Sequence, residues 1–217
     1  SRFNDNCDIS DKELGIEGIN EELLKDIWGE NYSKYMNKLD KAVNETEGLI
    51  MTLNNKPIDS KYHITCGGST ENSENVIGNE VIYLRKVLCD YCKNSPKWEN
   101  EKQMLLKDIE DKLDVKFPKI TPFLGTEIIG FIEGIERDES GRVTSIKIGG
   151  KEFKGKEVMD TLDLNSTKFS VTPTSISFNT RGKGYGLGLC QYGGNKMGDL
   201  GYPFEDILKY YYTGVDI

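Results

Sequence analysis

The sequence predicts an α+β fold, with a β-rich centre (a meander or a barrel-like sheet) and helices flanking it. Three observations support this class. Apolar residues recur with helical spacing near both ends of the chain, within 21–46 and 204–212. The segment from Gly125 to Phe153 alternates apolar and polar residues as strands do. Strands and helices do not alternate regularly, which argues against a parallel α/β sheet.

The first predicted elements are a helix and a hairpin. Residues 21–46 place several apolar side chains on one helical face, and Gly29 is expected to divide the helix into two pieces. This helical N-terminal part, residues 1–48, precedes the β-rich region. Residues 49–53 and 56–62 then form a predicted β-hairpin around an Asn54-Asn55 turn. The apolar helical positions are Leu23, Leu24, Ile27, Tyr35, Leu39 and Val43.

The middle and the end of the chain supply the remaining elements. Residues 97–116 carry an apolar stripe opposite a charged face, which predicts a second helix. The strands of 125–153 are separated by turns at 138–141 and 149–150, so they form a meander. A short helix at 157–162, strand residues in 169–178 broken by Pro173, and a closing helix at 204–212 complete the prediction.

Composition excludes some classes of partner. The chain has 217 residues and a net charge of −8 at pH 7. Binding to nucleic acid or to an anionic membrane face needs clustered Lys and Arg, so neither is expected. No run of 18 apolar residues occurs, and no signal segment begins at Ser1. A membrane anchor is therefore expected only upstream of Ser1.

The chain contains five cysteines, an odd number that rules out a complete set of intrachain disulfides. Cys89 and Cys92 have the C-x-x-C spacing that lets two thiolates bind one metal ion. We expect a structural zinc site formed by these two residues and Cys66, with Cys7 or His63 as the fourth ligand. Free buried thiols and a single disulfide are the alternatives.

The segment from Gly182 to Gly194, G-K-G-Y-G-L-G-L-C-Q-Y-G-G, is too rich in glycine for an ordinary helix or strand, and it predicts a loop. Its polar residues Tyr185, Cys190, Gln191 and Tyr192 could contact a polar, flat ligand. The alternative is a turn that only stabilises the fold. The segment matches neither phosphate-binding glycine pattern, which argues against a nucleotide site.

Three stretches of the chain resemble the SpoIID/LytB family. The family's G-R-G-Y-G-H-G-V-G-M-S-Q-Y-G-A run corresponds to residues 181–194, and its E-I-L-x-Y-Y-Y-T-G ending corresponds to 205–214. Its Y-H-S-S-x-G-G-x-T-E-N-x-E-x-V-W-G motif appears as Y-H-I-T-C-G-G-S-T-E-N-S-E-N-V-I-G at 62–78, followed by Tyr83-Leu84. The similarity extends roughly from Asp40 to the end of the chain.

The resemblance implies a peptidoglycan lytic transglycosylase that acts on N-acetylmuramyl and N-acetylglucosamine strands during engulfment in sporulation. It implies a membrane-anchored, extracytoplasmic envelope protein whose partners are glycan strands and other engulfment proteins, and whose catalysis needs no cofactor. The residues expected to bind the glycan are His63, Cys66, Gly67, Gly68, Tyr185, Gln191 and Tyr192.

The sequence departs from the family pattern at three points. Leu187 replaces the family's His, and Cys190 replaces its Ser. The E-M-P segment that carries the family's proposed acid does not occur in these residues, so we expect a fragment that is inactive alone. Glu71 is the carboxylate best placed by motif, either as a catalytic acid or, more in keeping with the family, as a brace for the Gly67-Gly68 turn. The alternative function is a non-catalytic glycan-binding or amidase-modifier module.

Overall fold

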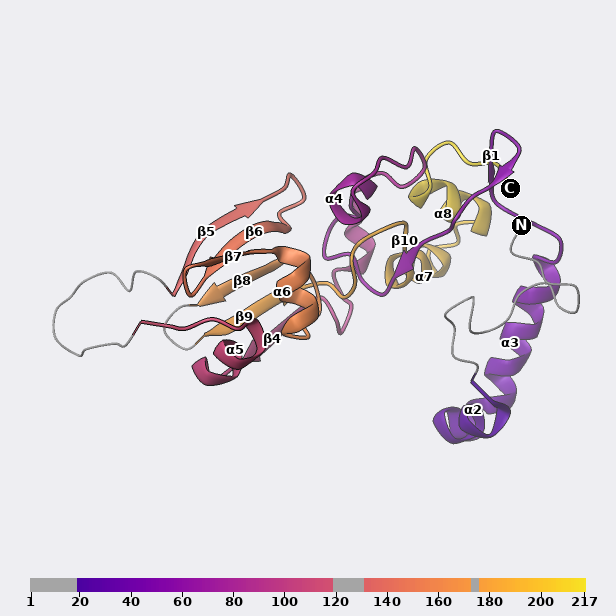
Figure 1. Cartoon of the computed structure of the whole chain (residues 1–217). Coiled ribbons are helices and arrows are strands. Elements are labelled where there is room, and N and C mark those ends of the chain that lie inside the picture. The colour runs from indigo at the N-terminus through magenta and orange to yellow at the C-terminus, as the bar shows by residue number, and fades with distance from the viewer. Residues whose placement is uncertain (1–18, 119–130, 173–175) are drawn as a thin grey trace, which may run out of the picture. The chain divides into compact units, whose positions relative to one another are not determined.

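The computed structural model describes residues 19–118, 131–172 and 176–217, and the chain divides into two compact units, 1–49 and 50–217. The first unit contains helix α2 (Glu21–Trp28), the short 3-10 helix η1 (Gly29–Asn31) and helix α3 (Tyr32–Glu45) (Figure 1). The Asn20 side chain caps α2 by accepting a hydrogen bond from Leu23 N. Gly29 ends α2 with a φ of 50°, so the predicted division of the helix is confirmed.

The second unit begins with the predicted hairpin. Strands β1 (Thr52–Leu53) and β2 (Lys56–Pro57) pair antiparallel, and Asn54 and Asn55 form the turn with φ angles of 51° and 61°. Asparagine tolerates this left-handed conformation better than most residues. Strand β3 (Tyr62–His63), helix α4 (Ser73–Ile77) and the 3-10 helix η2 (Asp90–Cys92) follow.

This unit contains two three-stranded antiparallel sheets, which lie next to each other (Figure 1). One is the predicted meander of β5 (Ile132–Arg137), β6 (Val143–Ile148) and β7 (Lys151–Lys154). The other has the order β4-β9-β8, with β4 at Glu99–Gln103, β8 at Phe169–Thr172 and β9 at Ser177–Arg181. The α+β class and the meander are confirmed. Within the described ranges every sheet is open, so the barrel-like alternative is wrong. The predicted strand residues 125–130 and Pro173 lie outside the described residues.

The predicted helix at 97–116 is wrong in its first half. Residues Glu99–Gln103 form strand β4, and only Leu106–Leu113 form a helix, α5. Every residue of β4 pairs with one of β9, from Glu99 opposite Arg181 to Gln103 opposite Ser177. This hydrogen-bonded ladder with a distant segment overrides the weak helical preference of a Glu- and Lys-rich stretch.

The glycine-rich segment is a loop only as far as Gly188. Leu189–Cys190 form strand β10, and Gln191–Asp199 form helix α7, which the prediction missed. Cys190 caps this helix, because its Sγ accepts a hydrogen bond from Gly193 N at 3.4 Å. A Cβ atom at Gly193 would lie 2.3 Å from the Tyr211 hydroxyl, so glycine here allows close packing against helix α8 (Phe204–Tyr211). The two remaining predicted helices are confirmed as α6 (Gly155–Thr161) and α8.

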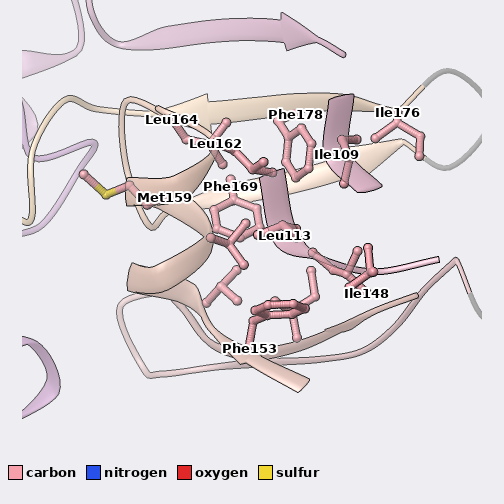
Figure 2. Close-up of a cluster of buried hydrophobic side chains, with 14 of the residues drawn as sticks. Ile109, Leu113, Ile148, Phe153, Met159, Leu162, Leu164, Phe169, Ile176 and Phe178 are labelled. Carbon is pink, nitrogen blue, oxygen red and sulfur yellow. The ribbon is translucent and has the colours of Figure 1, made fainter. Parts of the chain in front are cut away.

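The second unit buries two hydrophobic clusters. The sheet core lies between the two three-stranded sheets, α5 and α6, and in Figure 2 Phe153 and Ile148 face Phe169 and Phe178 across it. The cysteine core lies around β3, η2, α7 and α8. The sheet core comprises Ile109, Leu113, Val115, Phe131, Val143, Ile146, Ile148, Phe153, Val158, Met159, Leu162, Leu164, Phe169, Ile176 and Phe178. The cysteine core comprises Cys66, Leu84, Cys89, Cys92, Cys190, Met197, Tyr211, Tyr212 and Val215.

Among the helices of the described ranges, none combines the length and the apolar character that crossing a bilayer requires.

Candidate functional site

A cleft of about 380 Å³ lies where the motif around His63 meets the glycine-rich segment. Strand β3 contributes one side, and the loop before β10 contributes another. The residues lining the cleft are Lys61, Tyr62, His63, Ile64, Met159, Asp163, Leu164, Asn165, Lys183, Gly184, Tyr185, Leu187 and Gln191. The predicted site residues His63, Tyr185 and Gln191 therefore share one cleft.

Backbone pairing holds the two motifs together. Strands β3 and β10 run parallel, with Tyr62 opposite Leu189 and His63 opposite Cys190. Two further hydrogen bonds join Thr65 and Lys183, with N to O distances of 3.1 and 2.7 Å. Segments more than 100 residues apart in the sequence thus form one side of the cleft as a hydrogen-bonded pair.

His63 is buried beside the cleft, with 5% of its surface exposed. Its Nδ1 lies 3.0 Å from the carbonyl oxygen of Leu187. Burial lowers the pKa of His63 to about 4, so the ring is neutral at pH 7. A carbonyl oxygen can only accept, which places the proton on Nδ1 and leaves Nε2 as an acceptor. In the described part of the chain, Nε2 has no hydrogen-bond partner.

The other predicted glycan contacts divide into two groups. The Tyr185 hydroxyl donates to Asp160 Oδ1 at 2.6 Å, which orients the half-buried ring at the cleft. Gln191 is exposed at the first residue of α7 and also lines the cleft. Tyr192 lies outside the cleft lining, and its hydroxyl donates to the carbonyl oxygen of Asn94 at 3.0 Å.

Cys66, Gly67 and Gly68 do not line this cleft. Cys66 is fully buried. A Cβ at Gly67 would lie 2.8 Å from the Arg181 carbonyl oxygen, and one at Gly68 would lie 3.6 Å from the Trp98 ring. Gly67 and Gly68 therefore let the segment that follows Cys66 pack closely against Arg181 and Trp98.

Glu71 is completely buried and belongs to a polar network. Its Oε1 accepts hydrogen bonds from Asn72 N at 2.8 Å and from Asn75 Nδ2 at 2.9 Å. Its Oε2 lies 3.4 Å from Nε of Arg142, which is 3% exposed. Burial raises the pKa of Glu71. A carboxyl group without exposed surface cannot reach a substrate oxygen. The predicted brace of the Gly67-Gly68 turn is at most indirect, through Arg142 and its bond to the Cys66 carbonyl oxygen.

Arg142 extends this network to three other segments. Its Nη1 donates to Ser166 Oγ and Thr167 Oγ1, and its Nη2 donates to the Cys66 carbonyl oxygen at 3.1 Å. A Cβ at Gly186 would lie 2.3 Å from Nη2 of Arg142, so glycine is required there by close approach. The Glu71–Arg142 pair therefore fixes the glycine-rich segment as well as the segment around Cys66.

Four cysteine thiols meet in the cysteine core. Cys66, Cys89, Cys92 and Cys190 are buried, and their Sγ atoms all lie within 4.8 Å of one another. The three cysteines predicted as metal ligands are thus together. The neighbouring fourth group is Cys190, which the sequence reasoning had assigned to the glycine-rich loop. Cys7, an expected candidate for the fourth position, lies outside the described residues.

Several cleft residues were missed by the sequence reasoning. Tyr62, 64% exposed, lies next to His63 in the quoted motif, and that adjacency was an available signal. Asn165 and Asp163 come from the loop after α6, and no motif marks them. Only the folding of that loop against the glycine-rich segment places them here, as in the hydrogen bond from Gly184 N to Asn165 O at 2.9 Å.

Comparison with known proteins gives relatives that cover most of the chain, although no family model matches it. Stage II sporulation protein D of Bacillus subtilis (strain 168) is 36% identical over 89% of this chain and 55% of its own length. Its counterpart from Bacillus amyloliquefaciens is 34% identical over the same shares. The amidase enhancer of Bacillus subtilis is 25% identical over 82% of this chain and 32% of its own length.

The chain spans about half the length of the two sporulation proteins that it matches. The similarity to them nevertheless covers 89% of this chain, which confirms the resemblance inferred from the motifs. The chain belongs to the family of stage II sporulation protein D.

Proposed function

We propose that this chain binds peptidoglycan glycan strands and takes part in cell-wall remodelling during sporulation, on the extracytoplasmic side of the membrane. The similarity to stage II sporulation protein D supports the process. The cleft between the β3 motif and the glycine-rich segment supports the binding. In this proposal other engulfment proteins act beside this one.

The observation that carries the proposal is the combination of groups in the cleft. Tyr62 offers an exposed aromatic ring, on which the apolar face of a pyranose ring can pack. Gln191 and Asn165 offer side-chain amides, which can pair with the acetamido groups of both sugars. The buried His63 supports this wall from behind, because its Nδ1 donates to the Leu187 carbonyl oxygen in the glycine-rich segment. A few polar groups on a partly apolar wall are typical of a small-ligand site.

For the intact protein we propose lytic transglycosylation. A carboxylic acid protonates the glycosidic oxygen, and the bond from the muramyl anomeric carbon to that oxygen breaks. The muramyl 6-hydroxyl then attacks the anomeric carbon and gives its proton to the resulting carboxylate, which forms a 1,6-anhydro ring without water and restores the acid. We assign the acid to the E-M-P glutamate that the family resemblance implies. The role of the present residues is to bind and orient the strand.

A second candidate is a non-catalytic module that binds glycan and modifies an amidase. The distant similarity to the amidase enhancer favours it, as does Leu187 in the position of the family's His. The two candidates share glycan binding and differ in the product that the intact protein forms.

Binding is tested with the full 217-residue chain and fluorescently labelled, peptide-free glycan strands. We expect saturable binding that Tyr62→Ala weakens by about tenfold, or ~1.4 kcal/mol. Tyr202→Ala is the matched control, because Tyr202 is 44% exposed and lies outside this cleft. An equal effect of both variants, or no binding by the wild type, would overturn the proposal.

Catalysis is tested with the intact protein, including the E-M-P segment, on the same strands. We expect products with anhydromuramic ends, and their loss when the E-M-P glutamate is changed to glutamine. Glycan binding without anhydromuramic products would favour the modifier module. Release of these products by the 217-residue chain alone would assign the acid to this chain instead.

A further inference from the structure

Three segments that are distant in the sequence bring four thiols to one point in the cysteine core. Cys66 follows β3, Cys89 immediately precedes η2, Cys92 is its last residue, and Cys190 precedes α7. All four side chains have 0% exposed surface. The proposed glycan cleft does not use this cluster, since none of the four residues lines it.

The geometry of the cluster suits one tetrahedral ion. The four Sγ atoms lie within 4.8 Å of one another, and those of Cys66 and Cys92 are 3.3 Å apart. Thiolates about 2.3 Å from a central zinc ion are separated from one another by roughly 3.8 Å. A slight contraction of the widest separation, and a slight expansion of the Cys66–Cys92 pair, would give this arrangement.

The donor set selects the metal. Four sulfur ligands exclude hard cations such as Mg²⁺ and Ca²⁺, which bind oxygen, and are typical of zinc. We propose that Cys66, Cys89, Cys92 and Cys190 bind one zinc ion through four thiolates. Each thiol releases its proton on binding, so the filled site carries two negative charges.

Hydrogen-bond donors around the cluster suit that negative charge. The Gly193 backbone N lies 3.4 Å from Cys190 Sγ, and the Tyr211 hydroxyl lies 3.2 Å from Cys89 Sγ. The buried guanidinium of Arg142 donates to the carbonyl oxygen of Cys66. Donors of this kind orient thiolate ligands and stabilise their charge.

Four protein ligands leave no open coordination position, so the zinc is structural and takes no part in bond cleavage. It joins the segment after β3, η2 and the start of α7. Because Cys190 pairs with His63 between β10 and β3, the ion also fixes one side of the cleft. This consequence depends on the proposed function, whereas the zinc site does not.

The test measures zinc in the full 217-residue chain, purified under reducing conditions without chelator. We expect about one zinc per chain by elemental analysis and native mass spectrometry. In Cys190→Ser we expect zinc to fall at least about tenfold at the same free zinc concentration, since a serine hydroxyl is a poor zinc ligand. Serine can still cap α7, which separates ligand loss from helix loss. Cys7→Ser is the matched control, and we expect it to keep its zinc.

Cobalt binding provides a readout that does not depend on the variants. Co²⁺ replacing zinc in the wild-type chain should give the intense visible bands of tetrahedral thiolate coordination. If Cys190→Ser fails to fold, zinc content and these bands in the wild type decide the matter. Zinc-free wild-type protein with reduced thiols, a disulfide between these cysteines, iron in place of zinc, or zinc loss in Cys7→Ser would each overturn the proposal.

Discussion

The sheet core and the cysteine core of residues 50–217 are built from different chemistry. The sheet core is formed by aliphatic and phenyl side chains, with one methionine, on two three-stranded sheets and two helices. The cysteine core contains four thiols and two tyrosines, and its strands β3 and β10 have two residues each. The first is stabilised by buried apolar area, which is non-directional. The second depends on particular polar atoms at particular distances.

Side-chain hydrogen bonds between distant segments supplement the short strands of the cysteine core. The Tyr212 hydroxyl donates to the Lys61 carbonyl oxygen, and the Tyr192 hydroxyl donates to that of Asn94. Each bond joins segments about 100 residues or more apart in the sequence. Substitutions in the sheet core should therefore destabilise the protein in proportion to the apolar volume removed, whereas the loss of single polar atoms should matter in the cysteine core.

The largest effect is expected from Phe178→Ala in the sheet core. Phe178 is fully buried, and its ring packs edge-on against Phe169 with centroids 5.9 Å apart. Removing it leaves a cavity, and we expect the free energy of unfolding to fall by about 4 kcal/mol, measured by chemical denaturation. Leu105→Ala is the control, because Leu105 is 71% exposed and should cost less than about 0.5 kcal/mol. Equal losses in both variants would contradict the account of this core.

Arg142→Met should have the next largest effect, because Arg142 links the two cores. It lies just before β6 and donates to the Cys66 carbonyl oxygen. Its loss leaves the Glu71 carboxyl group buried without its charged partner, so we expect a loss of about 3 kcal/mol in the free energy of unfolding. Arg137→Met, which removes an exposed guanidinium, should cost about 1 kcal/mol.

A double variant checks the cause of the Arg142 effect. Adding Glu71→Gln to Arg142→Met replaces an unpaired buried acid with a neutral amide. We therefore expect the double variant to be more stable than Arg142→Met alone. A double variant that is less stable would show that the loss comes from packing and not from the buried charge.

Tyr212 should make the cysteine core sensitive to alkaline pH. Burial raises the pKa of Tyr212 from 10.0 to about 12. The unfolded phenol therefore loses its proton first, so this stabilisation is complete below pH 10 and is lost as pH rises towards 12. The full loss is roughly 2–3 kcal/mol. The unfolding free energy of the wild type should therefore fall relative to that of Tyr212→Phe as pH rises above 10. A difference that is constant with pH would refute this.

The smallest effect is expected from Tyr211→Phe. This change removes only the hydroxyl that lies 3.2 Å from Cys89 Sγ, and we expect a loss of about 1 kcal/mol in unfolding free energy. It should also speed the release of zinc to a competing chelator, because a thiolate loses a donor. Tyr210→Phe is the matched control on the same helix, since its hydroxyl contacts the Leu88 carbonyl oxygen. Equal rates of zinc release in the two variants would show that the Tyr211 hydroxyl does not stabilise the proposed zinc site.

Local sequence patterns predicted the elements whose stabilising contacts are near in sequence. Gly29 divides the first helix, Asn54-Asn55 forms the hairpin turn, and Gly149-Gly150 turns between β6 and β7. In each case the turn residue itself tolerates the required backbone angles. Patterns failed at β4, where pairing with β9 overrides the helical preference, and at α7, where glycine packs against Tyr211.

The same distinction between local pattern and distant contact applies to the residues of the candidate site. Residue types and motifs named His63, Tyr185 and Gln191, which share one cleft, and Cys66, Cys89 and Cys92, whose thiols meet. That a glycan or a metal binds there stays a prediction. Folding alone brought Tyr62 and Asn165 into the cleft, Cys190 to the other thiols, and Glu71 to Arg142. The physical reason is range: turn and helix preferences act over a few residues, whereas these contacts join segments that only the packing of the two cores makes neighbours.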